Sequence, residues 1–159
     1  MILKVVGQAL KTTFVKIFMF FLQWTWGIIQ NLLGLFLMLC IRQKALHSFH
    51  GAVIVEYHDQ AFTKRFGTFA LGMFIFYKDT DQKTKQNILT HEYGHTIQSM
   101  IYGPFFIPIV GFCSIRWALN YSKNREKYNA LNIFYADKYP EKQANFWGEK
   151  ILGNQGIYW

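Results

Sequence analysis

The chain has 159 residues, of which 52% are hydrophobic, 19% aromatic and only 16% charged, and its formal net charge is +8. This length suits one domain with its own core and is too short for two domains of ordinary size. The high apolar and low charged fractions are unusual for a soluble domain and indicate contact with a membrane. Nucleic-acid binding could explain the positive charge. The chain has no helix-turn-helix, zinc-finger or RNA-binding motif, however, so we expect no nucleic-acid partner and favour attraction to a lipid bilayer with anionic headgroups.

The most apolar part of the chain is the uncharged segment 17–41, which we expect to form an N-terminal membrane helix. Its length is sufficient to cross a bilayer with some tilt. Small and amide-bearing residues recur along it at helical spacing: Gln23, Gly27, Gln30, Asn31 and Gly34. This amide stripe predicts that one side of the helix packs against another helix. Trp24 and Trp26 are typical of the membrane interface, so a spanning helix and an interfacial helix both remain open.

Two β-branched and aromatic runs follow, over residues 51–58 and 68–77. They predict two strands, which we expect to form a β-hairpin closed by the polar loop 59–67. A charged turn over residues 79–85 then leads into a predicted helix over residues 84–102. The expected organisation is a membrane helix region over residues 1–46 and a minimal metal-binding domain over residues 47–159.

The predicted helix over residues 84–102 carries the pattern H-E-x-x-H, with His91, Glu92 and His95 as its defined residues. Residues four apart lie on one face of a helix, so the two imidazoles project side by side. Two neutral imidazoles in this arrangement can bind zinc, and the glutamate between them can reach a metal-bound water. The pattern therefore predicts a zinc site, which needs a third protein ligand.

Glu141 is the best candidate for the third ligand. Pro140 precedes it and suits the first turn of a helix, because proline lacks the N–H that would be unpaired there. The competing candidates are Asp137, Glu149 and Cys113. Cys113 lies in an apolar run, where a cysteine is usually a small buried hydrophobic residue.

The order H-E-x-x-H followed by E-x-x-A-N at residues 141–145 resembles the gluzincin branch of zinc metallopeptidases. This resemblance implies that His91, His95 and Glu141 bind Zn²⁺ and that Glu92 activates the zinc-bound water. It also implies that the side chain at position 145 orients a histidine ligand. The family usually has aspartate there, whereas this chain has Asn145, which can accept a hydrogen bond but carries no charge.

The resemblance can be narrowed to small bacterial membrane-associated proteins with a predicted gluzincin-like site. It covers most of the chain from about residue 24 and is specific only at the motif. It implies a location at the bacterial inner membrane, with the orientation open, and a peptide or membrane-protein substrate. In gluzincin-like cores an edge strand runs beside the metal helix and pairs with the substrate, which assigns residues 68–73 to the cleft.

We therefore expect an α+β fold with an N-terminal membrane-associated helix, a small hairpin or sheet and a zincin-like pair of metal-binding helices. The expected function is a membrane-associated zinc metallopeptidase, a hydrolase of peptide bonds. Tyr135 and Tyr139 are candidates for stabilising the oxyanion by proximity in the sequence only, and amphipathic packing is the simpler explanation for both. Two alternatives remain: a non-catalytic zinc-binding membrane scaffold, and a basic membrane-binding protein with an incidental motif. The sequence leaves the oligomeric state open.

Overall fold

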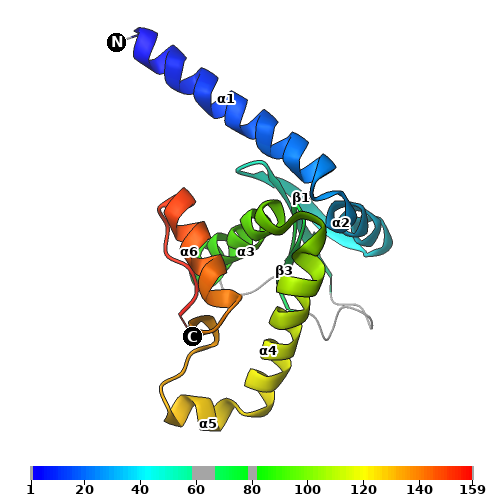
Figure 1. The fold of residues 1–159 in the computed structure, drawn as a ribbon, viewed down its shortest axis with the longest axis vertical. Helices are drawn as coiled ribbons and strands as arrows, with labels where there is room; N and C mark the ends of the chain where they lie inside the picture. Colours follow the sequence, from blue (N-terminus) through cyan, green and yellow to red (C-terminus); the bar gives the residue numbers. More distant parts are fainter. Residues whose placement is uncertain (1, 59–66, 79–81, 159) are drawn as a thin grey trace.

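The computed structural model describes residues 2–58, 67–78 and 82–158 and has an α+β architecture, in agreement with the predicted class (Figure 1). The predicted loop 59–67 and the start of the predicted turn 79–85 lie largely outside the described residues. The α-helices are α1 (Ile2–Thr25), α2 (Ile28–Cys40), α3 (Gln82–Tyr102), α4 (Phe112–Lys123), α5 (Arg125–Ala130) and α6 (Glu141–Leu152). The strands are β1 (Gln43–Phe49), β2 (Ala52–Tyr57), β3 (Phe69–Leu71) and β4 (Phe74–Lys78). Three short helical turns complete the described chain: η2 (Gly103–Phe105), η3 (Ile107–Gly111) and η4 (Tyr135–Asp137).

The four strands form one mixed sheet in the order β1-β2-β4-β3. Strands β2 and β4 are parallel neighbours, and β1 and β3 pair antiparallel to them at the two edges. The predicted hairpin between residues 51–58 and 68–77 is therefore wrong. The reason is Gly72, which has a φ of +64° and turns the second run back on itself as β3 and β4. Only glycine fits there, because a Cβ atom at this position would lie 2.0 Å from Asn31 Oδ1.

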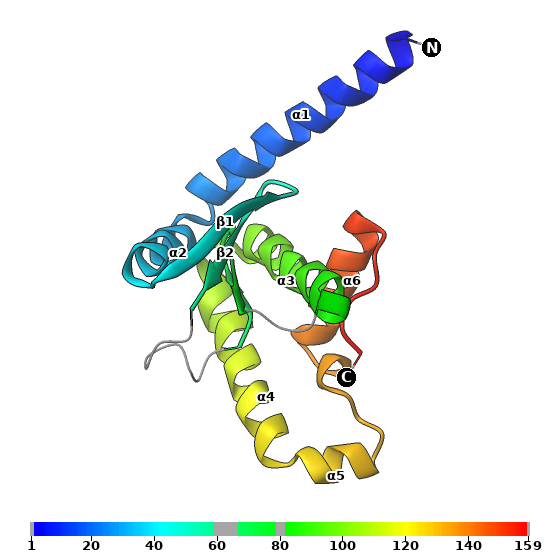
Figure 2. The same cartoon turned by 180° about the vertical axis from the view of Figure 1, so that it is seen from behind.

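The sheet lies between two helices. Helix α3 covers one face, where Tyr93 and Ile97 pack against Ile75 and Tyr77. Residues of α2 cover the other face around Phe76. Helix α6 lies on the far side of α3 from α2, as opposite views of the molecule show (Figures 1 and 2). Helix α3 is thus a central element that contacts both the sheet and α6.

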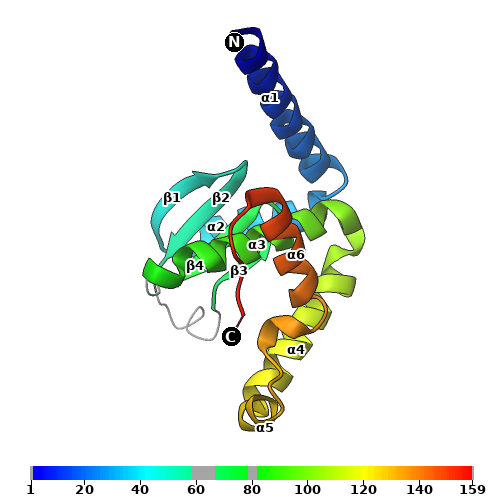
Figure 3. The same cartoon turned by 90° about the vertical axis from the view of Figure 1, so that its left-hand side faces the viewer.

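The predicted N-terminal membrane helix is not continuous. The chain breaks between α1 and α2, and the segments Thr13–Thr25 and Ile28–Cys40 meet at an angle of 89°. A second bent pair, Thr84–Phe105 with Ile107–Lys123, has an angle of 118°. Within the described residues no single helix has the length and apolar character to cross a bilayer, although each bent pair does when its two parts are taken together. Helix α1 extends away from the rest of the molecule (Figure 3).

Gln23 and Gln30 of the amide stripe bond to α3 and its C-terminal end, so the prediction that the stripe faces another helix is confirmed for these two residues. Asn31 and Gly34 pack instead against the turn between β3 and β4. Gln23 Nε2 donates to the Thr96 carbonyl at 3.1 Å, and Gln30 Nε2 donates to Ser99 Oγ at 2.9 Å and to the Gly103 carbonyl at 3.0 Å. Both glutamines are buried. These amides therefore satisfy backbone and hydroxyl groups where the two bent pairs meet.

Glycine allows α3 and α6 to approach closely at two points. A Cβ atom on Gly94 would lie 1.8 Å from the Ala144 carbonyl oxygen, and one on Gly148 would lie 2.0 Å from that of Thr90. Both obstacles are helix backbone, which cannot yield as a flexible side chain can. The spacing of the two helices therefore depends on these glycines.

We expect Gly94→Ala to lower the free energy of unfolding by about 1–3 kcal/mol, because the added methyl forces the helices apart. Chemical denaturation measures this loss. Gly111→Ala is the matched control, since the nearest atoms to a Cβ there are 4.0 Å away. Equal stability of the Gly94→Ala and Gly111→Ala variants would contradict the proposed close contact.

Candidate metal centre

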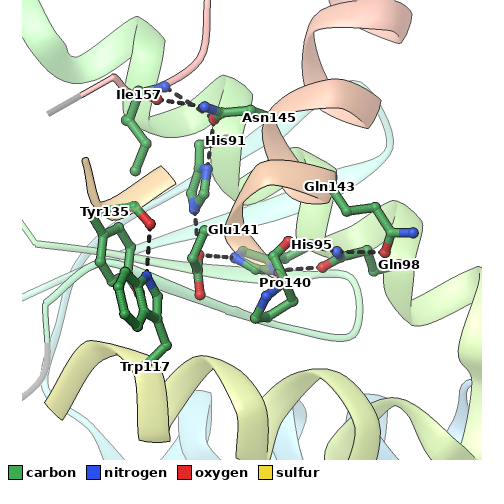
Figure 4. A network of polar contacts seen from close by, with 10 residues as sticks. All are labelled: His91, His95, Gln98, Trp117, Tyr135, Pro140, Glu141, Gln143, Asn145 and Ile157. Atoms are coloured by element: carbon green, nitrogen blue, oxygen red, sulfur yellow. Dashed lines mark hydrogen bonds and ion pairs between the residues drawn. The ribbon is translucent and has the colours of Figure 1, made fainter. Parts of the chain in front are cut away.

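Three buried side chains converge between α3 and α6 (Figure 4). Glu141 Oε2 lies 3.0 Å from His91 Nε2 and 3.1 Å from His95 Nε2. The histidines project from the same face of α3, and Glu141 is the first residue of α6, directly after Pro140. Among the described residues this is the one group of histidine, cysteine and acidic side chains that could hold a metal ion, with all ligand atoms within 4.8 Å of one another.

The second ring nitrogen of His91 is held by an amide. His91 Nδ1 lies 2.8 Å from Asn145 Oδ1. The orientation of this amide is fixed by the C-terminal tail, because the Asn145 amide nitrogen donates to the Ile157 carbonyl and the Ile157 N–H donates back to Oδ1 at 3.1 Å. Oδ1 is therefore the acceptor, so the amide holds the Nδ1 side of the ring, and Nε2 is the His91 atom that faces Glu141.

His95 is held in the same way by Gln98, at 2.7 Å between His95 Nδ1 and Gln98 Oε1. The Gln98 Nε2 atom donates to the Pro140 carbonyl and to Gln143 Oε1, which fixes this amide as well. The sequence analysis missed Gln98. Its position three residues after His95 on one helix face was the available signal.

Two of the three separations between the candidate ligand atoms suit a tetrahedral metal, and the two histidine nitrogens lie within 4.8 Å of each other. Bonds of about 2.0–2.1 Å in a tetrahedron place ligand atoms about 3.3 Å apart, close to the observed 3.0 and 3.1 Å. Two carboxylate oxygens at the site, Glu92 Oε2 and Glu141 Oε1, are buried without a hydrogen-bond partner among the described residues. A buried carboxylate oxygen ordinarily has a partner, so both atoms fit a site that receives a cation and water.

The electrostatics of the metal-free cluster follow from burial and from the close charges. Burial favours the neutral form of His95, but Glu141, Glu92 and Gln98 together outweigh burial and raise the pKa of His95 to about 9. Burial would raise the pKa of Glu141, yet the two histidines hold it well below its ordinary value. Burial raises the pKa of Glu92, against the lowering effect of the histidines and of a hydrogen bond from the Ala70 backbone.

This arrangement predicts a pH-dependent metal affinity. Below about pH 9 the metal-free His95 carries an additional proton that a metal must displace. The apparent affinity should therefore rise with pH by about tenfold per pH unit for one displaced proton, and level off above the pKa of His95. Chelator competition between pH 6 and pH 8 measures the slope, and calorimetry in buffers of different ionisation enthalpy counts the protons released. An affinity independent of pH would contradict a ligand set that contains His95.

The two tyrosines named from the sequence lie in different surroundings. Burial and the neighbouring Glu141 carboxylate raise the pKa of Tyr135, and Ser114 and Glu141 are side chains that act on its hydroxyl. Trp117 Nε1 donates to the Tyr135 carbonyl at 2.7 Å and holds this turn in place (Figure 4). Tyr139 is 44% exposed, and its raised pKa reflects burial, Tyr102 and Cys113. The structure places Tyr135 near Glu141 of the cluster. The groups that act on the Tyr139 hydroxyl include neither Glu92 nor Glu141.

The other residues considered as the third metal ligand have different partners. Asp137 Oδ2 accepts from the Phe134 N–H, and Glu149 Oε1 accepts from the Gly156 N–H and the Tyr158 hydroxyl. Cys113 lies near Tyr139. Glu141 is therefore the carboxylate that the structure places between the two histidines.

Comparison of the chain with family models, with curated proteins and with solved structures gave no match in any of the three. Any functional conclusion therefore rests on the geometry and chemistry of the cluster itself.

Proposed function

We propose that the protein is a membrane-associated zinc-dependent peptidase. The observation that carries this proposal is the convergence of His91 Nε2, His95 Nε2 and Glu141 Oε2, with the Nδ1 atom of each histidine held by a fixed amide. Two imidazoles and one carboxylate form a donor set typical of catalytic zinc, which leaves a fourth position open. When bound, zinc would supply Lewis-acid chemistry, polarising water and the substrate carbonyl.

Glu92 is the residue that turns metal binding into a proposal for catalysis. It lies beside the two histidine ligands on α3, is 6% exposed, and has one oxygen without a partner among the described residues. A scaffold that only held a metal would gain nothing from a second buried carboxylate, which is costly to bury. In the proposed reaction Glu92 accepts a proton from the attacking water and passes it to the leaving amine.

Tyr135 is placed to assist at the carbonyl oxygen. A tyrosine hydroxyl is protonated at neutral pH and can donate a hydrogen bond, and the raised pKa of Tyr135 is consistent with that role. Donors aimed at a developing negative charge stabilise it strongly in a buried site. We therefore assign Tyr135, rather than the more exposed Tyr139, the role of donor to the oxyanion.

The substrate would lie along β3. This strand pairs with β4 on one side only and forms an edge of the sheet. The backbone of Ala70, in the middle of β3, bonds to the Glu92 carboxylate, so the edge strand adjoins the proposed base. An extended peptide added to this edge would bring its backbone beside Glu92, and main-chain pairing tolerates many sequences.

Metal analysis combined with a peptide-cleavage screen tests the proposal. Protein purified in detergent without chelators should contain about one zinc per chain. It should also cleave members of a mixed peptide library, and the cleavage should stop when zinc is removed and resume when zinc is restored. A protein that holds zinc but cleaves nothing would support the non-catalytic scaffold, and a protein without zinc after reconstitution would support the incidental motif.

A further inference from the structure

Helix α2 has its polar side buried and its apolar side exposed, the reverse of a helix on the surface of a soluble domain. Gln30 and Asn31 are fully buried, and Gly34 is buried beside Phe74. Apart from Cys40 at its C-terminal end, the exposed side chains of the helix are large and apolar: Ile28 42%, Ile29 46%, Leu32 51%, Leu33 46%, Phe36 65% and Leu39 71%. A surface helix ordinarily turns its apolar stripe to the core and its polar face to water. The outer side of α2 is therefore suited to an apolar medium.

The exposed apolar surface continues across the point where the two bent helix pairs meet. A Cβ atom on Gly103 would lie 2.1 Å from Trp26 Nε1, and Gln30 donates to the Gly103 carbonyl, so the two breaks are in contact. Exposed apolar side chains flank these breaks on both segments: Phe18, Phe21, Trp26, Ile101, Phe105, Ile109, Phe112 and Ile115. We call these residues, together with the six large apolar residues exposed on α2, the apolar face.

The charge of these segments identifies the medium that covers the apolar face. Residues 1–55 and 93–125 contain no aspartate or glutamate. Lys16, Arg42 and Arg116 are exposed within or directly beside the apolar segments. An apolar surface bordered by cations and free of anions complements a bilayer with anionic headgroups.

We propose that the apolar face is buried in the apolar part of a lipid bilayer, with the bent pairs entering the membrane without a continuous helix across it. The amide stripe then serves to satisfy backbone carbonyls that would otherwise face a medium without water. This is a different attachment from the single membrane helix expected from the sequence.

The membrane attachment also bears on the proposed peptidase site, and this step rests on the proposed function. Asn31 Oδ1 accepts the Met73 N–H at 2.7 Å and lies against Gly72, so α2 holds the turn between β3 and β4 directly. The edge strand proposed to pair with the substrate is thus attached to the helix that contacts lipid. Polypeptide segments at the membrane surface are the substrate class that this geometry favours.

Vesicle flotation of the full chain tests the attachment. The protein, transferred from detergent to vesicles of phosphatidylethanolamine and phosphatidylglycerol, should float with them. It should remain bound in about 1 M salt, where the Debye length falls to about 3 Å and purely electrostatic binding fails. Leu32→Lys with Phe36→Lys should lower the ratio of bound to free protein by about tenfold or more, because a cation is costly in the apolar phase.

The matched control is Phe146→Lys with Ile151→Lys on α6, which replaces a phenylalanine and an aliphatic residue that are 52% and 47% exposed. Unchanged binding of this control supports the proposal, whereas an equal loss in both double variants overturns it. Circular dichroism and thermal melting establish that both variants are folded. Loss of wild-type binding in high salt also overturns the proposal.

A nitroxide probe distinguishes lipid from a protein partner on the same face. It is attached at Leu33→Cys in a chain with Cys40→Ser and Cys113→Ser. Collisions with oxygen but not with a water-soluble nickel complex support lipid contact. Exclusion of both reagents would mean that a second copy or another protein covers the face. Neither experiment depends on zinc, so the two proposals can fail separately. A protein that binds vesicles but holds no metal would reject only the proposed peptidase activity. A protein that cleaves peptides but does not bind vesicles would reject only the proposed membrane attachment.

Discussion

Glu92→Gln should retain the metal and lose about 10²–10⁴-fold in kcat/KM on any peptide that the wild type cleaves. Glutamine has nearly the same shape as glutamate but cannot accept the proton of the attacking water. Glu92 is not one of the three converging ligand atoms, so metal binding should persist. Elemental analysis and peptide-cleavage kinetics, carried out on the same preparation, measure the two effects.

The control for this substitution is Glu126→Gln, which removes a carboxylate from an exposed position on α5. It should leave both metal content and cleavage unchanged. Activity of the Glu92→Gln variant equal to that of the wild type would remove Glu92 as the base, whatever the metal content. Loss of metal together with activity would instead indicate that Glu92 is a ligand.

Glu141→Ala should reduce zinc affinity by more than about 100-fold, a larger loss than removal of a supporting residue around a metal site. The variant removes one of the three candidate ligands and leaves the His91 and His95 nitrogens without their shared carboxylate. A chelator titration followed by elemental analysis measures the affinity. Because bound metal stabilises the folded state, the zinc-dependent increase in melting temperature should also disappear.

Asn145→Ala provides a graded comparison, since Asn145 contacts His91 without being a predicted ligand. It should weaken zinc binding by about 10–100-fold, less than Glu141→Ala does. Stoichiometric zinc of wild-type affinity in Glu141→Ala would exclude Glu141 from the ligand set.

The metal helix and its ligands are the parts that local sequence patterns predict best. The helix predicted over residues 84–102 is observed as α3, and it ends where Gly103 adopts a φ of +52° ahead of Pro104. The fixed spacing of His91 and His95 on one helix places their imidazoles together irrespective of the remaining fold. Pro140 likewise marks the start of α6 and puts Glu141 in its first turn.

Local sequence patterns did not predict the contacts between segments that lie far apart in the chain. The run 68–77 has the composition of one strand, yet Asn31 accepts the Met73 N–H and Gly72 turns the chain, so two strands form. The uncharged segment 17–41 has the length of one membrane helix, yet its amides bond to the carbonyls of Thr96 and Gly103, and the helix breaks between Thr25 and Ile28. In both places a buried polar group finds its partner far along the chain, which periodicity does not reveal.

The sequence by itself therefore determined the residue types, their helical spacing and the candidate ligand set. Only the tertiary structure decided that Gln98 and Asn145 fix the two histidines, that Ala70 reaches Glu92, and that α2 turns its apolar side outward. The physical reason is the distance along the chain over which the deciding contacts act. Helical spacing is set by bonds within a few residues, whereas the partner of each buried amide is set by the packing of α3 against its neighbours.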